Sequence, residues 1–218
     1  MAIDTSFGAA TTLVDRRAVR RQQTIAEALT YALAIIAEGG VGALSISEVA
    51  RRMGLRGPSL YKYFPSLNAV YDALFAYGVA AHKNAIDGAM AARPPGVERI
   101  RALMQASVRW SVSNPALAQL LFWRPVPGFE PSAEAFAASL ETQKSLRAEL
   151  AEATRRKQLS AAANTDEAVR LLTVVISGLF TQQVANQPNV GYDQGQFSQL
   201  TDAATEMLLA RFQPRRRS

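Results

Sequence analysis

Ten prolines divide this 218-residue sequence into segments that each repeat apolar side chains at helical spacing. Within these segments apolar residues recur every three to four positions, which is typical of amphipathic helices. No segment alternates apolar and polar residues between hairpin turns, as a half-buried strand would. We therefore expect an all-α protein of about nine helices.

Local signals mark where the first helices begin and end. The first is expected over residues 16–38, and the second begins at the capping box Ser45-Ile-Ser-Glu48 and ends at Gly54. Pro58 suits the first turn of a third helix, because the missing N–H of proline costs nothing there. Pro65 ends this helix, Ser66 caps a fourth, and five more are expected at about 97–113, 115–123 (capped by Asn114), 132–158, 165–186 (capped by Thr165) and 196–212.

Composition limits the kinds of protein that this chain can be. The sequence has no cysteine and one histidine, which excludes disulfides and thiolate chemistry and weighs against a histidine-based metal site or a catalytic triad. We see no secretory leader and no apolar run of the about 18–20 residues that span a bilayer. We therefore expect a cytoplasmic protein with no membrane partner, no catalytic residues, no metal and no cofactor.

The formal charge is +6, and basic residues concentrate in the first third of the chain. Arg16, Arg17, Arg20 and Arg21 occupy the first turns of the first expected helix, where the helix dipole disfavours each cation by about 0.3–1 kcal/mol. An external anion explains this placement, and DNA phosphate is the natural candidate. The alternative is a solvated charged face.

The segment from Leu55 to Pro65, "LRGPSLYKYFP", forms the second half of a helix-turn-helix. Leu60 and Phe64 are four residues apart, so we expect them to dock together on the preceding helices. The outward positions then carry groups that can reach phosphates and base edges, namely Pro58, Ser59, Tyr61, Lys62 and Tyr63. The alternative is that one of the two tyrosines is a partly buried core residue.

Residues 45–74, "SISEVARRMGLRGPSLYKYFPSLNAVYDAL", closely resemble the DNA-binding signature of TetR-family transcriptional regulators. The resemblance implies a homodimer with an N-terminal DNA-binding head and a helical effector domain. It places DNA contacts at Ser45, Pro58, Ser59, Tyr61, Lys62 and Tyr63, to which we add the basic residues Arg17, Arg20 and Arg56. Leu67 departs from the family pattern, because a phosphate-binding lysine is common at that position.

The resemblance and the helix pattern together divide the chain into four parts. We expect a disordered arm at residues 1–14, a helix-turn-helix DNA-binding domain at 15–65, an effector-binding and dimerisation domain at 66–213, and a basic tail at 214–218.

Large aromatic residues and a few amides gather in the second half of the sequence. Such residues line small-molecule cavities, although aromatics at helical spacing are more often plain core. His82 is expected at the surface. The candidate effector-binding residues are Trp110, Phe122, Trp123, Phe136, Phe180 and Gln183.

The segment 168–180, "AVRLLTVVISGLF", is apolar nearly all round, and the last helix carries an apolar stripe. A helix that is covered on every side is either central or shared with a partner. Packing within one chain and a buried strand are the alternatives. The candidate dimerisation residues are Leu172, Ile176, Leu179, Leu200, Met207 and Leu208.

The sequence thus predicts a ligand-responsive regulator of transcription that binds double-stranded DNA. We expect a repressor that leaves a palindromic operator when a small apolar effector binds. Two alternatives stay open, namely a helical homodimer whose head has lost DNA binding and a helical small-molecule enzyme.

Overall fold

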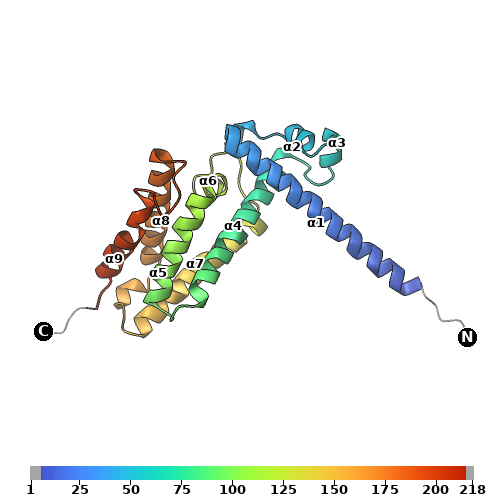
Figure 1. Ribbon diagram of the computed structural model, residues 1–218. Coiled ribbons are helices and arrows are strands. Elements are labelled where there is room, and N and C mark those ends of the chain that lie inside the picture. Colours follow the sequence, from blue (N-terminus) through green and yellow to red (C-terminus); the bar gives the residue numbers. More distant parts are fainter. Residues whose placement is uncertain (1–5, 215–218) are drawn as a thin grey trace, which may run out of the picture. The chain divides into compact units, whose positions relative to one another are not determined.

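The computed structural model describes residues 6–214, which contain nine α-helices and no strand (Figure 1). The all-α prediction is confirmed. The chain divides into two compact units, and the division falls between Leu74 and Phe75. Residues 1–5 of the predicted arm and residues 215–218 of the predicted basic tail lie outside the described residues.

The first unit is built from three helices and the beginning of a fourth. α1 spans Ser6–Gly39, α2 spans Ile46–Arg52, α3 spans Gly57–Leu60, and α4 begins at Leu67; a short 3-10 turn, Val41–Ala43, connects α1 to α2. Buried apolar side chains from the four helices and from the segments between them form the core of this unit. These residues are Ala28, Ala32, Ile35, Ile36, Leu44, Ile46, Val49, Ala50, Leu60, Phe64, Val70 and Leu74.

α1 begins earlier than the sequence predicted. The helix includes residues 6–14, which the sequence analysis assigned to a disordered arm. This stretch contains no proline, so no residue in it breaks the backbone hydrogen-bond pattern of a helix that has already formed.

The boundary between the units also lies later than the expected position at residues 65 and 66. The first turns of α4 belong to the head, because Val70 and Leu74 are buried in its core. The hydroxyl of Tyr71 donates a hydrogen bond of 2.7 Å to the carbonyl of Val41. α4 (Leu67–Ala91) is therefore one helix that contributes residues to both units.

The second unit contains the rest of α4 and five further helices: α5 (Val97–Ser113), α6 (Pro115–Phe122), α7 (Ala133–Arg155), α8 (Asp166–Asn186) and α9 (Thr201–Arg211). Two 3-10 turns, Ala161–Ala163 and Ser198–Leu200, precede α8 and α9. α5 is the central element, since it packs against α6, α7, α8 and α9 (Figure 1). Its buried face carries Ile100, Leu103, Met104 and Val108, which join the main apolar cluster.

Three of the four predicted helix caps, Ser45, Ser66 and Thr165, are present, and the fourth, Asn114, is not. Thr165 accepts a hydrogen bond from the N–H of Ala168 at 3.2 Å, and Ser66 accepts one from Ala69 at 3.2 Å. Asn114 makes no side-chain bond to α6, and its amide donates instead to the carbonyl of Trp110 at 2.9 Å. The last carbonyls of α5 lack helical partners, so the Asn114 amide is used to complete α5.

Candidate nucleic-acid interface and ligand pocket

α3 is a single turn that two apolar side chains hold in place. Leu60 is fully buried and Phe64 is nearly so, which confirms the predicted burial of this pair. Gly54 has a φ of +69°, a left-handed conformation that costs glycine little and reverses the chain between α2 and α3. A helix this short depends on such packing, because isolated helices of this length are unstable in water.

α3 ends at Leu60, whereas the sequence predicted a helix that continued to Pro65. Tyr61, Lys62 and Tyr63 therefore lie in the turn that follows α3. The residue before a proline is disfavoured in the helical conformation, so the last predicted turn unwinds ahead of Pro65. The N–H of Phe64 still donates to the carbonyl of Leu60 at 3.0 Å, which keeps this turn tight.

The surface beside α3 carries most of the predicted DNA contacts. Tyr61 has 51% of its surface exposed, Pro58 and Lys62 are also exposed, and Ser59 is half-buried. These side chains are available to a partner outside the first unit.

Two further predicted contacts lie at helix starts. Arg56 is exposed at the N-cap of α3 and makes no side-chain capping bond there. Ser45 is the N-cap of α2, where its hydroxyl oxygen accepts from the N–H of Glu48 at 3.2 Å. Its O–H group can still donate to an anion.

Tyr63 differs from Tyr61, because it is half-buried between two cations. The guanidinium carbon of Arg21 lies 5.3 Å from the centre of its ring, and the ammonium nitrogen of Lys62 lies 4.9 Å from it. Arg21 also donates to the carbonyl of Lys62 at 3.3 Å. Hydrogen bonding to Thr24, and then to Lys62, lowers the pKa of Tyr63 below its ordinary value. Tyr63 thus joins α1 to the turn after α3.

The arginines of the first unit fall into two groups. Arg17 and Arg20 are exposed, and no ion pair to either occurs among the described residues. Arg51 and Arg52, in contrast, bind Glu48 at 2.7 and 2.9 Å, and Arg52 also binds Glu38 at 2.6 Å. These hydrogen bonds lower the pKa of Glu48 to about 2. Arg17 and Arg20 of α1 are therefore open to an external anion, whereas Arg51 and Arg52 of α2 are neutralised within the unit.

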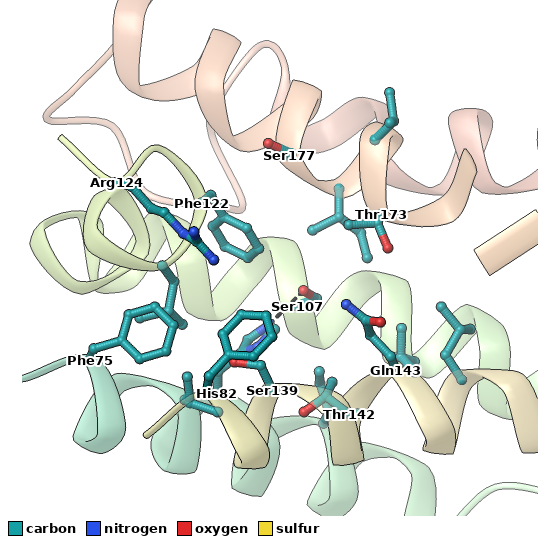
Figure 2. Close-up of a pocket in the computed structure, with 18 residues that line it drawn as sticks. Phe75, His82, Ser107, Phe122, Arg124, Ser139, Thr142, Gln143, Thr173 and Ser177 are labelled. Carbon is teal, nitrogen blue, oxygen red and sulfur yellow. Dashed lines mark hydrogen bonds between the residues drawn. The ribbon is translucent and has the colours of Figure 1, made fainter. Parts of the chain in front are cut away.

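A pocket of about 450 Å³ lies within the second unit, between α4, α5, α7, α8 and the end of α6 (Figure 2). Its wall is mostly apolar and carries aromatic rings at Phe75, Phe122 and Phe136. The rings of Phe75 and Phe136 stack with centres 6.5 Å apart. Pockets of about 300–1,000 Å³ with such linings hold drug-sized ligands.

His82 lines this pocket and is buried, whereas the sequence analysis expected it at the surface. Its Nε2 lies 2.6 Å from the hydroxyl oxygen of Ser107, and its ring packs against Trp110 and Phe122 with centres 4.9 and 5.9 Å away. Burial lowers the pKa of His82 to about 4. The imidazole is therefore neutral at pH 7.

The six predicted effector-binding residues do not lie together in one site. Phe122 and Phe136 line the pocket, and Trp110 lines a second groove on the outside of α4 and α5. Phe180 is buried behind the wall, where its ring packs against Phe122 and Trp123 at 6.0 and 5.5 Å.

Gln183 has a structural role in place of the predicted contact with a ligand. Its amide donates to the carbonyls of Gln187 and Val190, and its oxygen accepts from the N–H groups of Phe197 and Ser198. All of these partners belong to the loop between α8 and α9, so the amide is used up in holding that loop.

The predicted dimerisation residues also differ from one another, since some are buried within the chain and others are exposed. Leu172, Ile176 and Leu208 are buried in the core of their own chain, so they are not positioned to meet a partner. Leu200 and Met207 are exposed, at 50% and 69%, and Leu179 is half-buried. Val174, which the sequence analysis did not select, is 66% exposed on α8.

α8 is long and apolar enough to cross a membrane by its length and composition. It nevertheless contacts α5, α7 and α9, and its buried face belongs to the main apolar cluster of the second unit. Its apolar character is therefore explained on one face by the core of its own chain, and the exposed face remains available to a partner.

Several residues of the pocket wall were not predicted from the sequence, above all Phe75, Ser107, Arg124 and Thr142. A signal for one side of the wall was present, because Phe75, Val79, His82 and Ile86 follow one another at helical spacing along α4. The facing residues lie on α5, α7 and the end of α6, and only the folded chain brings them together.

Two family models match this sequence. "Tetracyclin repressor-like, C-terminal domain" matches residues 100–208, and "Bacterial regulatory proteins, tetR family" matches residues 28–74. The second match covers α2, α3 and the first turns of α4, and the first covers most of the second unit.

Curated relatives are similar over part of their length. The HTH-type transcriptional regulator Rv1816 of Mycobacterium tuberculosis is 28% identical over 121 residues, which are 53% of this chain and 50% of that protein. Nucleoid occlusion factor SlmA of Haemophilus influenzae is 25% identical over 109 residues, 50% of this chain and 49% of that protein. The matched segment thus spans about half the length of these relatives.

Solved structures share the fold at low sequence identity. FadR from Bacillus subtilis in complex with stearoyl-CoA is 15% identical with a TM-score of 0.68, over 84% of this chain and 97% of that one. PfmR from Thermus thermophilus, a TetR-family regulator, is 19% identical with a TM-score of 0.62, over 84% and 97% of the two chains.

Proposed function

Because this chain belongs to the TetR family, we propose that it is a DNA-binding transcriptional regulator whose operator affinity is set by a small molecule in the pocket of the second unit. One observation carries the DNA-binding part of this proposal. Tyr61 and Lys62 are exposed beside a one-turn helix whose other face is anchored in the core of the head. The side chains of such a segment can contact a DNA groove, because the packing of the head does not depend on them.

The exposed residues of the head suit different parts of a DNA duplex. We assign Tyr61 and Lys62 to base edges, since both are exposed and a phenol and an ammonium both donate hydrogen bonds. Arg17 and Arg20 are suited to phosphates, because a guanidinium binds phosphate oxygens with two parallel hydrogen bonds. We assign Tyr63 to positioning, because Arg21 and Lys62 already enclose its ring.

Four smaller contacts complete the proposed interface. Arg56, Ser45 and Ser59 are suited to the phosphate backbone near the starts of α2 and α3. Pro58 fills the first turn of α3 and is suited to apolar contact with a base or sugar.

We propose a homodimer that pairs through the exposed apolar positions of α8 and α9. Val174, Leu200 and Met207 are large apolar residues with half or more of their surface exposed. A second copy of the chain covers the same positions by symmetry, because a two-fold interface uses one patch twice. Such a dimer fits a palindromic operator whose half-sites are spaced by whole helical turns of about 34–36 Å.

The proposed coupling between ligand and DNA runs through α4. Val70 and Tyr71 of this helix are buried in the head, and Val79 and His82 line the pocket further along the same helix. A ligand that moves the pocket portion of α4 therefore also acts on the head. By linkage, an effector that weakens DNA binding is itself bound more weakly by the DNA-bound protein, by the same factor. The solved structure of Bacillus subtilis FadR in complex with stearoyl-CoA supports an effector with an apolar chain, since a protein of this fold binds a molecule that carries one.

The DNA-binding part is tested with fluorescently labelled duplexes of the intergenic DNA beside the protein's own gene. We expect one duplex to bind more tightly than a scrambled duplex of equal length, with an affinity that falls steeply as salt increases. Equal binding to all duplexes at every salt concentration would contradict operator recognition. No binding to any duplex would favour the alternative of a homodimer whose head has lost DNA binding, for which Leu67 at the start of α4 is the sequence argument.

The alternative of a helical enzyme has one structural feature in its favour, the hydrogen-bonded pair of His82 and Ser107. Ser107 lies in the middle of α5, however, where backbone N–H groups are bonded within the helix. The backbone beside Ser107 therefore offers no oxyanion donors, and no carboxylate of the described chain lines the pocket to orient His82 as in a Ser-His-Asp triad. We therefore favour a binding pocket over an active site.

A further inference from the structure

The charge of the pocket wall indicates which class of molecule it accepts, an inference that rests on the proposed function. Two ionisable side chains line the pocket among the described residues, His82 and Arg124. His82 is buried and neutral at pH 7. Arg124 is therefore the charged group of the wall, and no carboxylate of the lining opposes it.

Arg124 is held at one end of the pocket by the backbone and by an aromatic ring. It follows the last residues of α6 with a φ of +46°, a left-handed conformation that ends the helix. Its guanidinium carbon lies 5.5 Å from the centre of the Phe136 ring. Figure 2 shows its side chain reaching from the end of α6 toward the ring of Phe122.

The hydrogen-bond donors of Arg124 are not used elsewhere in the described part of the chain. No ion pair or side-chain hydrogen bond joins its guanidinium to another described residue, whereas Arg99, Arg101, Arg109 and Arg147 of this unit all bind carboxylates. A ring face stacks on a guanidinium plane and leaves its five N–H donors at the edges. These donors match the two oxygens of a carboxylate.

The rest of the pocket is suited to an uncharged, elongated body. Phe75 and Ile86 both line it from α4, and at 1.5 Å per helical residue they are about 16 Å apart along the helix axis. The aliphatic side chains of Leu103 and Leu146 also line the pocket and belong to the same buried apolar cluster as Ile86. Apolar surface of this kind stabilises a hydrocarbon chain by about 25 cal/mol per Å² that it removes from water.

From this arrangement we propose that the effector is an anionic amphiphile, an apolar chain that ends in a carboxylate, with the carboxylate at Arg124 and the chain directed toward Ile86. A cationic compound of the same shape is disfavoured, because it would meet Arg124 and no acidic group of the wall. A hydroxyl or oxo group along the chain has a partner in Thr142, whose Oγ1 is buried without a hydrogen bond in the described chain.

The test uses the full-length protein and three ligands that differ in their head groups: decanoate, decanol and decyltrimethylammonium, each below its micelle concentration. Calorimetry measures binding to the protein alone, and fluorescence anisotropy of labelled operator DNA separately measures release. Trp123 precedes Arg124 and Trp110 contacts His82, so tryptophan emission gives a second measure of occupancy. Decanoyl-CoA is included to distinguish a free carboxylate from an anionic thioester.

We expect decanoate to bind more tightly than decanol, and decyltrimethylammonium to bind least. Arg124→Gln should weaken decanoate by about tenfold, a modest value because Arg124 is exposed, and leave decanol unchanged. Arg124→Lys should restore part of the loss, since it returns the charge without the planar fork. Arg156→Gln is the matched control, because it removes an exposed arginine at the C-terminal end of α7, outside the pocket wall.

Equal binding of the three head groups, or decanoate binding that is unaffected by Arg124→Gln, would overturn the assignment of an anionic amphiphile. Tighter binding of decanoyl-CoA than of decanoate would overturn the free carboxylate as the ligand. Decanoate that binds in an Arg124-dependent manner but leaves operator affinity unchanged would support the ligand class and refute the proposed regulation. The two proposals therefore fail through different measurements.

Discussion

The Nε2 atom of His82 lies 2.6 Å from the hydroxyl oxygen of Ser107, and this contact joins the middle of α4 to the middle of α5 in the wall of the pocket. His82 is the only histidine in the sequence. The effect of its burial on the free energy of unfolding can therefore be measured by varying the pH.

We predict that the free energy of unfolding falls as the pH is lowered from 7 to 5. The pKa of His82 is depressed to about 4 in the folded protein, below the 6.5 of the unfolded chain. Between these values the unfolded state binds a proton that the folded state does not, so acid favours unfolding. The stabilising effect is present in full above pH 6.5 and is lost as the pH falls toward 4. Urea denaturation at pH 5, 6 and 7 should show that the free energy of unfolding falls with pH in the wild type and falls less in His82→Gln. An equal dependence on pH in both proteins would show that His82 is not its cause.

Tyr61→Ala and Lys62→Ala are each expected to abolish or strongly weaken operator binding without changing the stability of the head. Both side chains are exposed, so their removal leaves the core intact. Anisotropy gives the affinity and thermal unfolding gives the stability. Phe64→Ala is the contrasting variant, since it should cost about 3–5 kcal/mol of stability by opening a cavity. Unchanged affinity in both surface variants would exclude this turn from the DNA groove.

Arg17→Ala and Arg20→Ala should weaken binding to every DNA sequence by a similar factor. Each lost phosphate contact should reduce the slope of log affinity against log salt by about 0.9. Arg51→Ala is the matched control, because Glu48 already engages its guanidinium at 2.7 Å. If Arg51→Ala changes the salt slope as much as Arg17→Ala does, the cations of the head act through their charge alone and not through individual phosphate contacts.

Met207→Glu is predicted to convert a dimer into a folded monomer. Its side chain is 69% exposed in the single chain, so the charge is hydrated in a monomer and desolvated in the proposed interface. Leu172→Ala should instead lower stability by about 2–5 kcal/mol and leave any dimer in place, because Leu172 is buried in its own chain. Sedimentation and denaturation measure the two effects, and a wild-type protein that is monomeric at micromolar concentration would contradict the dimer itself.

The features that were predicted correctly depend on chemistry that is local in the sequence. The helix at 97–113 was expected with the bounds that α5 shows, and Ser45 and Thr165 cap their helices as expected. The burial of Leu60 and Phe64 follows from their spacing of four residues on one face. In each case a few neighbouring residues determine the outcome.

The features that were missed depend on contacts between distant segments. α8 is apolar on nearly every side, so its sequence does not reveal which face meets the core, and Leu172 and Ile176 were assigned to the wrong face for this reason. Gln183 resembles a ligand-binding amide, but a loop that follows it in the chain satisfies its hydrogen bonds. Arg124 was not recognised because its position beside Phe136 requires α6 and α7 to be packed first.

The single turn of α3 has a consequence for how recognition by this head can change over time. Leu60 and Phe64 provide its stability, whereas Tyr61 and Lys62 lie outside the core. Substitutions at the two outer positions therefore alter which bases are contacted at little cost to folding, since surface changes are usually within about 0.5 kcal/mol. The DNA specificity of this head can therefore diverge after gene duplication while Leu60 and Phe64 are retained.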